Sequence, residues 1–182
     1  MQTIHKALKS HFDDQSQLAR LKIFNVQGIQ VEGWMKGEML YVFAQLKDRG
    51  IIEKYDREVC IKQKSRKKCD LQITMESKKY WIELKNWVLM QKGLRYTPKW
   101  YFSQKDYLYN DFIKLRDIPE TDEKWFAVIY SGKPSDNEWA EGMDIFSQRF
   151  NLEAIPIAFP RDYPEEYYLA LMQFNSLQES SS

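Results

Sequence analysis

The clearest pattern in the chain lies between residues 34 and 48, where apolar residues recur every three to four positions. This spacing predicts an amphipathic helix with one buried face. Gly50 follows the pattern and is a natural cap for the carboxyl end of the helix. A more polar helix is predicted over residues 3–20, followed by a looser segment at 24–31. The stripe expected to be buried consists of Met35, Met39, Val42, Phe43 and Leu46.

Alternation of apolar and polar residues predicts strands further along the chain. One strand is expected within residues 51–61, and two more at 70–75 and 80–86. The polar link at residues 76–79 is short enough to join the last two strands as an antiparallel hairpin. The alternation places three side chains on one face of the last strand: Trp81, Glu83 and Lys85.

The rest of the chain is expected to alternate between helices and strands. The apolar run at residues 126–130 is typical of a strand that is buried on both faces. The order of elements predicts an α/β fold in which helices flank a mixed central sheet. The other expected elements are a connector at 86–100, helices at 103–116, 137–150 and 164–177, and a strand at 154–159.

These elements predict one domain over residues 1–177. Residues 1–31 form an N-terminal helical extension in this scheme, residues 32–131 form the core, and residues 132–177 form a C-terminal addition with a further strand and helix. Residues 178–182 are predicted to be a disordered tail.

Composition excludes several classes of protein. The chain has 182 residues, of which 43% are hydrophobic, so it can bury a core without disulfide staples. Two cysteines and two histidines cannot build a disulfide framework or a four-cysteine zinc site. The chain contains no apolar run of about 18 residues that would cross a membrane. The first residues lack the apolar centre of a signal peptide, so we expect a cytoplasmic protein without membrane partners.

Charge is distributed unevenly along the chain, although the net charge is only +1. Residues 61–105 hold 12 Lys/Arg and 3 Asp/Glu, whereas the rest of the chain holds 15 and 23. Aromatic residues are interleaved with these cations, a combination that suits nucleic acid, although a basic run is often only a solvated loop. The residues predicted to contact nucleic acid are Lys62, Lys64, Arg66, Lys67, Lys68, Lys92, Arg95 and Lys99.

Asp70 lies on the strand that pairs with the strand of Glu83 and Lys85. If the hairpin turns near residue 77, Asp70 falls opposite Glu83 or Lys85. Two carboxylates this close repel each other unless a cation lies between them, and Mg²⁺ or Mn²⁺ suits such oxygen ligands. The backbone carbonyl of Leu84 is a further candidate ligand. Lys85 would position or deprotonate an attacking water, or stabilise charge on a phosphate.

Asp70 followed by Glu83-Leu84-Lys85 on the next strand resembles the PD-(D/E)XK nuclease superfamily, which has the restriction-endonuclease-like fold. The expected order of elements from residue 34 to 130 is similar to the α-β-β-β-α-β core of that family. The family usually has proline before the aspartate, where this chain has Cys69. The resemblance implies that Asp70 and Glu83 bind Mg²⁺, that Lys85 serves catalysis, and that Glu38 reaches the same site from the first core helix.

Two further residues are secondary candidates for this site. Gln72 shares the face of Asp70, with a role as sheet filler as the alternative. Lys114 lies on the helix after the motif, where the resembling family often places a lysine or glutamine facing the site; the alternative is an ordinary ion pair with Asp111, three residues earlier. Cys60 and Cys69 are expected to be small buried residues rather than nucleophiles.

The sequence therefore predicts a Mg²⁺-dependent endonuclease that acts on DNA, with RNA as an open alternative. An inactive nucleic-acid-binding module of the same fold and a structural protein with a salt-bridge network are the competing hypotheses. Cutting both strands commonly needs two sites, which a homodimer would supply. A partner protein is another source of specificity, because the chain has no room for a separate recognition domain.

Overall fold

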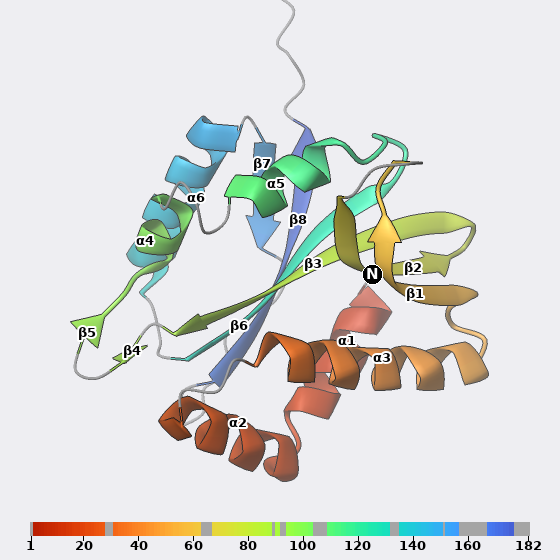
Figure 1. Cartoon of the computed structure of the whole chain (residues 1–182), viewed down its shortest axis with the longest axis horizontal. Helices are drawn as coiled ribbons and strands as arrows, with labels where there is room; N and C mark the ends of the chain where they lie inside the picture. Colours follow the sequence, from red (N-terminus) through yellow and green to blue (C-terminus); the bar gives the residue numbers. More distant parts are fainter. Residues whose placement is uncertain are drawn as a thin grey trace, which may run out of the picture.

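A six-stranded mixed sheet forms the centre of the molecule, with the strand order β1-β2-β3-β6-β8-β7 (Figure 1). The computed structural model describes residues 2–27, 31–62, 67–88, 90–91, 94–103, 109–131, 135–150, 152–156 and 167–176. The strands of the sheet are β1 (Lys54–Cys60), β2 (Lys68–Met75), β3 (Lys78–Val88), β6 (Glu123–Ser131), β7 (Leu152–Pro156) and β8 (Tyr167–Ser176). A separate two-stranded ribbon pairs β4 (Met90–Gln91) with β5 (Leu94–Arg95).

The predicted hairpin is present as β2 and β3, which pair antiparallel. Its two turn residues, Glu76 and Ser77, have φ of 53° and 60°. Positive φ at both central residues is the geometry of the tight turn that matches the twist of a hairpin. The Ser77 N–H donates to the carboxylate of Glu53 at 2.9 Å, which holds the turn against the segment before β1.

Helices cover both faces of the sheet, as the sequence predicts (Figure 1). On one face, α1 and α3 pack on the apolar side chains of β2 and β3. On the other, α4, α5 and α6 pack on aromatic residues of β3 and β6. The helices are α1 (Gln2–Phe12), α2 (Gln15–Gln27), α3 (Glu32–Asp48), α4 (Pro98–Ser103), α5 (Tyr109–Arg116) and α6 (Asp136–Phe150).

The predicted stripe on α3 is confirmed, because all five of its apolar residues are buried. The neighbouring strand β6 runs parallel to β3 and is buried along residues 124–130. A strand with this position is covered on both faces, which explains its continuous apolar run. Gly50 has a φ of 70° just after α3, as expected of a glycine at the end of a helix.

Several sequence predictions are wrong in detail. Residues 167–176 form strand β8 and not a helix, because this aromatic-rich segment pairs with both β6 and β7. The prediction failed because apolar periodicity alone does not separate a buried strand from a buried helix. The N-terminal helix is two helices, because Asp14 accepts a hydrogen bond from the Ser16 N–H at 2.8 Å and starts α2. The second of these helices continues to Gln27, so residues 24–27 of the segment expected to be loose are helical.

Two other predictions fall partly or wholly outside the described residues. The predicted helix at 103–116 corresponds to the end of α4 and to α5, with residues 104–108 outside the described part. The predicted tail at 178–182 also lies outside the described residues. Among the helices that the structure describes, none is long and apolar enough to cross a membrane.

Helices α4 and α6 meet at Gly142, and this contact yields a stability prediction. A Cβ at Gly142 would lie 3.0 Å from Pro98 Cβ and 3.1 Å from the backbone nitrogen of Lys99, closer than most Cβ atoms come to their neighbours. We expect Gly142→Ala to lower the free energy of unfolding by about 1–3 kcal/mol in chemical denaturation, because α4 must shift. The control is Gly37→Ala in α3, where no atom lies within 4 Å; it should raise stability by about 0.5–1 kcal/mol. Equal effects of the two substitutions would contradict this account.

Candidate active site

The sheet is distorted at Asp70. The pairing of β1 with β2 joins Arg57 to Leu71 and Val59 to Cys69, but skips the residues between them. Cys69 and Leu71 are two residues apart, yet they pack in the cores on opposite faces of the sheet. Because such residues normally share a face, β2 must rotate about its own axis at Asp70. Glu58, next to this point on β1, has a φ of 53°, which is unusual for a residue other than glycine.

This distortion brings the Asp70 carboxylate against the backbone of β3. Leu71 pairs with Ile82, so the register continues to Asp70 opposite Glu83. Asp70 Oδ2 accepts a hydrogen bond from the Leu84 N–H at 3.0 Å, a bond that a regular ladder would make to the backbone of β2. Further along β3, the Asn86 N–H donates to the Glu32 carboxylate at 3.3 Å. Two carboxylates therefore complete the hydrogen bonding of β3 where β2 separates from it.

Glu83 is the most deeply buried charged group of this site, with 3% of its side chain exposed. Its Oε1 lies 2.5 Å from the Lys114 ammonium, whereas its Oε2 is buried without a hydrogen-bond partner. Burial, followed by repulsion from the Asp70 carboxylate, raises the pKa of Glu83 to about 8. At neutral pH this carboxyl is therefore neutral for most of the time, unless a further cation compensates it.

Lys85 is held as a positive charge. Its ammonium lies 2.7 Å from Asp111 Oδ2 and 3.8 Å from Glu32 Oε1. Burial by itself would lower the pKa of Lys85, but the hydrogen bond and charge of Asp111, together with Glu32, raise it above its usual value. An ammonium group held in this way carries a positive charge and donates hydrogen bonds, and it is a poor base.

Lys114 connects two carboxylates, because its ammonium also lies 2.7 Å from Asp111 Oδ1. The ordinary ion pair with Asp111 is thus present, and the predicted approach of Lys114 to the site is present as well. Burial would lower the pKa of Lys114, but Glu83 and Asp111 raise it well above the usual value. Asp111 in turn has a lowered pKa: burial would raise it, and the two lysines outweigh burial.

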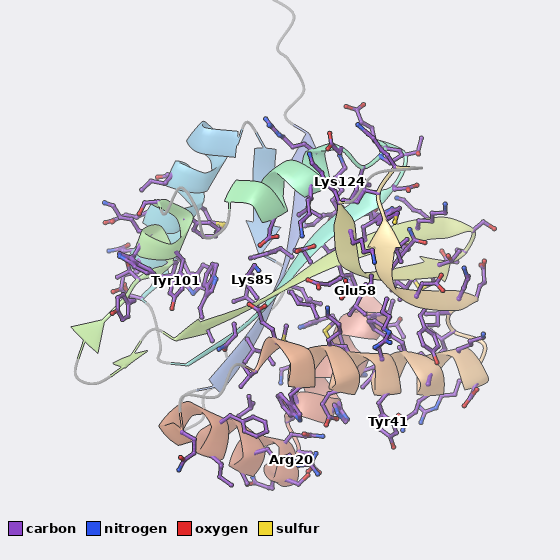
Figure 2. All side chains as sticks on the ribbon, viewed as in Figure 1. Arg20, Tyr41, Glu58, Lys85, Tyr101 and Lys124 are labelled. Carbon is purple, nitrogen blue, oxygen red and sulfur yellow. The ribbon has the colours of Figure 1, made fainter. Side chains whose placement is uncertain are left out.

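Sequence reasoning missed Lys36 and Glu58. The Lys36 ammonium lies 2.6 Å from Asp70 Oδ1 and also pairs with Glu58. Burial would lower the pKa of Lys36, but Asp70 and Glu58 raise it. Figure 2 shows Glu58 and Lys85 in the middle of the molecule, between α3 and α5. Glu32 and Lys36 are four residues apart on α3 and so share a face, which is the sequence signal that indicates their position.

Glu38 lies elsewhere, and the expectation that it reaches the site is corrected. Its Oε2 is 2.6 Å from His11 Nε2 and 2.9 Å from Gln17 Nε2, and its Oε1 is 3.3 Å from Arg20. Two residues along a helix are separated by about 200°, so Glu38 points away from the face of Lys36 and toward α1 and α2. Its place at the border of the buried stripe left both directions open from sequence alone.

The other candidates are dispersed. Gln72 is buried opposite Trp81 in the β2–β3 pairing. Lys62 and Lys67 both pair with Asp117, at 3.3 and 2.8 Å, and Lys99 pairs with Glu141 at 3.3 Å. Lys68 is exposed at the start of β2. The residues that fall outside the described part of the chain are Lys64, Arg66, Lys92 and the side chain of Arg95.

The two cysteines differ from each other. Cys69 is buried, and burial, followed by the charges of Glu83 and Asp70, raises the pKa of its thiol well above the usual value. A neutral thiol is a poor nucleophile, as expected. Cys60, in contrast to the prediction, is exposed.

The donor set suits a divalent cation held by two carboxylates. Glu83 offers a buried oxygen without a partner, and Asp70 is oriented by the Leu84 N–H. A residue in a strand directs its N–H and C=O toward the same neighbour, so the Leu84 carbonyl is on the side of Asp70. Within the described ranges, no three His, Cys, Asp or Glu residues are grouped to hold a metal by themselves. Mg²⁺ often uses one or two carboxylates and completes its shell with water and phosphate.

Comparison of this chain with protein-family models, with curated proteins and with solved structures gave no match. The function of this chain is therefore inferred from its own residues.

The raised pKa of Glu83 makes stability depend on pH. Between its ordinary value of 4.5 and about 8, the folded state holds a proton that the unfolded state has released. Stability is therefore lost as pH rises through this window. Glu83→Gln removes this loss, so the free energy of unfolding of the wild type should fall relative to the variant by on the order of a few kcal/mol between pH 4.5 and 8.5.

Denaturant titrations at several pH values measure this difference. Glu141→Gln, at an exposed ion pair, is the control for loss of a carboxylate. The groups that face Glu83 are Asp70, Cys69, Asp111 and Lys114, and they are the same in both proteins. Parallel pH profiles for the wild type and Glu83→Gln would show that Glu83 has an ordinary pKa.

Proposed function

We propose that this chain is a Mg²⁺-dependent endonuclease that hydrolyses phosphodiester bonds in DNA. The observation that carries the proposal is the pair of half-buried Asp70 and buried Glu83, beside the cation Lys85 on the same strand as Glu83. Among the described residues, none donates a hydrogen bond to Glu83 Oε2. A bound divalent ion would supply charge neutralisation at the phosphate and an activated water. The structural arrangement suits this chemistry because two like charges in a buried place are costly without a cation.

The order of elements supports the proposal. Helix α3, strands β1, β2 and β3, helix α5 and strand β6 follow one another as in the α-β-β-β-α-β core that the PD-(D/E)XK resemblance implies. Asp70 lies near the start of the second of these strands, and Glu83 and Lys85 lie on the third. The ribbon of β4 and β5 and helix α4 are inserted before α5, and β7 and β8 extend the sheet.

Each residue has a distinct task in this proposal. Asp70 and Glu83 bind the divalent ion, with the Leu84 carbonyl as a third oxygen donor. Lys85, kept protonated by Asp111, orients water and stabilises negative charge that develops on the phosphate. Asp111 is a positioning residue, because it acts through Lys85 and Lys114.

Lysines contact both carboxyl groups before any metal binds. The Lys36 ammonium lies against the Asp70 carboxylate, and the Lys114 ammonium lies against the Glu83 carboxyl. A divalent ion must compete with these ammonium groups for the same oxygens. Once displaced, the lysines remain next to the site and provide positive charge toward a phosphate.

The same lysine pairs favour the second candidate, a structural salt-bridge network without catalytic function. Asp70, Glu83 and Asp111 each have a lysine partner, so the network is satisfied except at Glu83 Oε2. Divalent-ion binding separates the two hypotheses, because a purely structural network does not bind Mg²⁺ or Mn²⁺.

Calorimetry with Mn²⁺ provides the first test. A protonated Glu83 must lose its proton when the ion binds, so the wild type should release close to one proton per ion at pH 7. The release should fall toward zero above pH 9, where Glu83 is already ionised. Titrations in buffers with different ionisation enthalpies measure the proton count. Asp70→Asn should abolish ion binding, whereas an unchanged isotherm would remove Asp70 from the metal site.

Replacement of Lys85 separates binding from chemistry. Lys85→Met should lower the rate of DNA cleavage by about two orders of magnitude or more, because its charge acts on the transition state. DNA affinity without metal should change less than threefold. Lys79→Met, at an exposed lysine of the same strand, is the matched control and should cleave at the wild-type rate. Cleavage by Lys85→Met at the wild-type rate would exclude the proposed role.

A further inference from the structure

A row of aromatic rings extends from the candidate active site to the surface. Trp87 is two residues beyond Lys85 on β3 and packs in the same core as Trp81 and Phe126. Its ring stacks on Tyr101 of α4, with a centroid distance of 5.0 Å and an angle of 10°. Tyr101 then meets Trp100 edge to face at 5.0 Å. Figure 2 shows Tyr101 beside the ribbon of β4 and β5, on the opposite side of Lys85 from Glu58.

Trp100 ends this row at the surface, with 40% of the residue exposed. Tyr96 packs beside it at a centroid distance of 4.8 Å, with the ring planes tilted by 55°. Neither tyrosine lies parallel to the indole, so within the described part of the chain no parallel ring covers a face of Trp100. The exposed part of the indole is therefore open to contact with a planar group.

The position of Trp100 is rigid. Helix α4 packs tightly on α6, because Gly142 allows the backbone of Lys99 and the side chains of Pro98 and Phe102 to come close. On the other side, Phe102 is fully buried against Trp87, which meets it edge to face at 5.1 Å. A ring held in place before binding loses little freedom when a ligand stacks on it.

The sequence segment around Trp100 is basic. Residues 86–105 contain four Lys/Arg and no Asp or Glu. Lys99, next to Trp100, pairs with Glu141 at 3.3 Å, and both side chains are about half exposed. Such a surface pair is weak, so Lys99 can turn to a phosphate at little cost. Tyr41, the other exposed aromatic residue in the described part of the chain, instead packs on His11 beside the acidic Glu38.

We propose that Trp100, with Tyr96 at its edge, is a stacking site for one base of an unpaired nucleic-acid strand. This inference rests on the proposed nuclease function for its direction: the strand would pass from Trp100 to the site of Asp70 and Glu83. Glu83 and Trp87 are four residues apart on β3, or roughly 13 Å, and each of the two ring steps from Trp87 through Tyr101 to Trp100 adds at most 5.0 Å between centroids. The stacked base would therefore lie a few nucleotides from the scissile phosphate. Bases within a duplex are already stacked on their neighbours, so the site selects unpaired segments.

Binding without metal tests the inference independently of cleavage. The probes are a labelled 12-nucleotide DNA strand of mixed sequence, the same strand in RNA, and the corresponding DNA duplex, all in EDTA. We expect Trp100→Ala to bind the single strands about 5- to 150-fold more weakly, with duplex affinity nearly unchanged. Trp100→Phe, which keeps an aromatic face, should restore most of the affinity. Tyr41→Ala, at an exposed aromatic residue far from this row, is the control.

The results separate the two proposals. If Trp100→Ala binds single strands as tightly as the wild type, the stacking site is excluded, whether or not the protein cleaves DNA. Equal losses for single strands and duplex would also exclude it, because they would indicate a site for the phosphate backbone alone. If the stacking result holds but Mn²⁺ is neither bound nor used for cleavage, the nuclease proposal fails and the binding site remains. A preference for the RNA or the DNA arm identifies the strand that the site takes.

A series of single strands, each lacking the base at one position, locates the stacked base when their affinities are compared. For the wild type, one position should weaken binding more than the others, and the cleaved bond should lie at a constant distance from it. Trp100→Ala should lose this dependence on position, and the Tyr41→Ala control should keep it. A wild-type profile without any sensitive position would overturn the inference.

Discussion

The repulsion between the half-buried carboxylate of Asp70 and the buried carboxyl of Glu83 is the constraint on which the site depends. Glu83 has almost no access to water, and one of its oxygens has no partner. Burial and the nearby Asp70 charge both favour the protonated form, which is why the pKa of Glu83 rises to about 8. The surrounding lysines reduce this cost but do not remove it. A structural role alone gives no reason to keep an acid in this place, whereas a cation-binding role does.

The distortion of the sheet at Asp70 allows the Asp70 carboxylate to lie against β3, next to Glu83. A regular β2–β3 ladder would bond the Leu84 N–H to the backbone of β2. The rotation of β2 at Asp70 releases that N–H, and the Asp70 carboxylate takes it instead. The positive φ of Glu58 on β1 belongs to the same irregularity, because the β1–β2 pairing skips that residue. Such backbone strain persists only where the surrounding structure holds it in place, and it is concentrated at functional sites.

Both helical layers contribute to the site. Helix α3 supplies Glu32 and Lys36 from one side, and α5 supplies Asp111 and Lys114 from the other. The three lysines therefore reach the carboxylates from three different elements, α3, β3 and α5. The aromatic row on β3 and α4 continues toward the surface from the face of β3 that carries Glu83, so the proposed stacking site and the buried acid share one side of the sheet.

The sequence by itself determined the hairpin, the α3 stripe, and the strand position of Asp70, Glu83 and Lys85. These features follow from local periodicity, because alternation places residues on faces without reference to the rest of the chain. It did not determine β8, since an apolar run fits a buried helix and a buried strand equally well. Only the tertiary structure decided that Glu38 points toward His11 while Lys36 points toward Asp70. The choice depends on which helix packs against each side of α3, and such long-range packing has no signature in the local pattern.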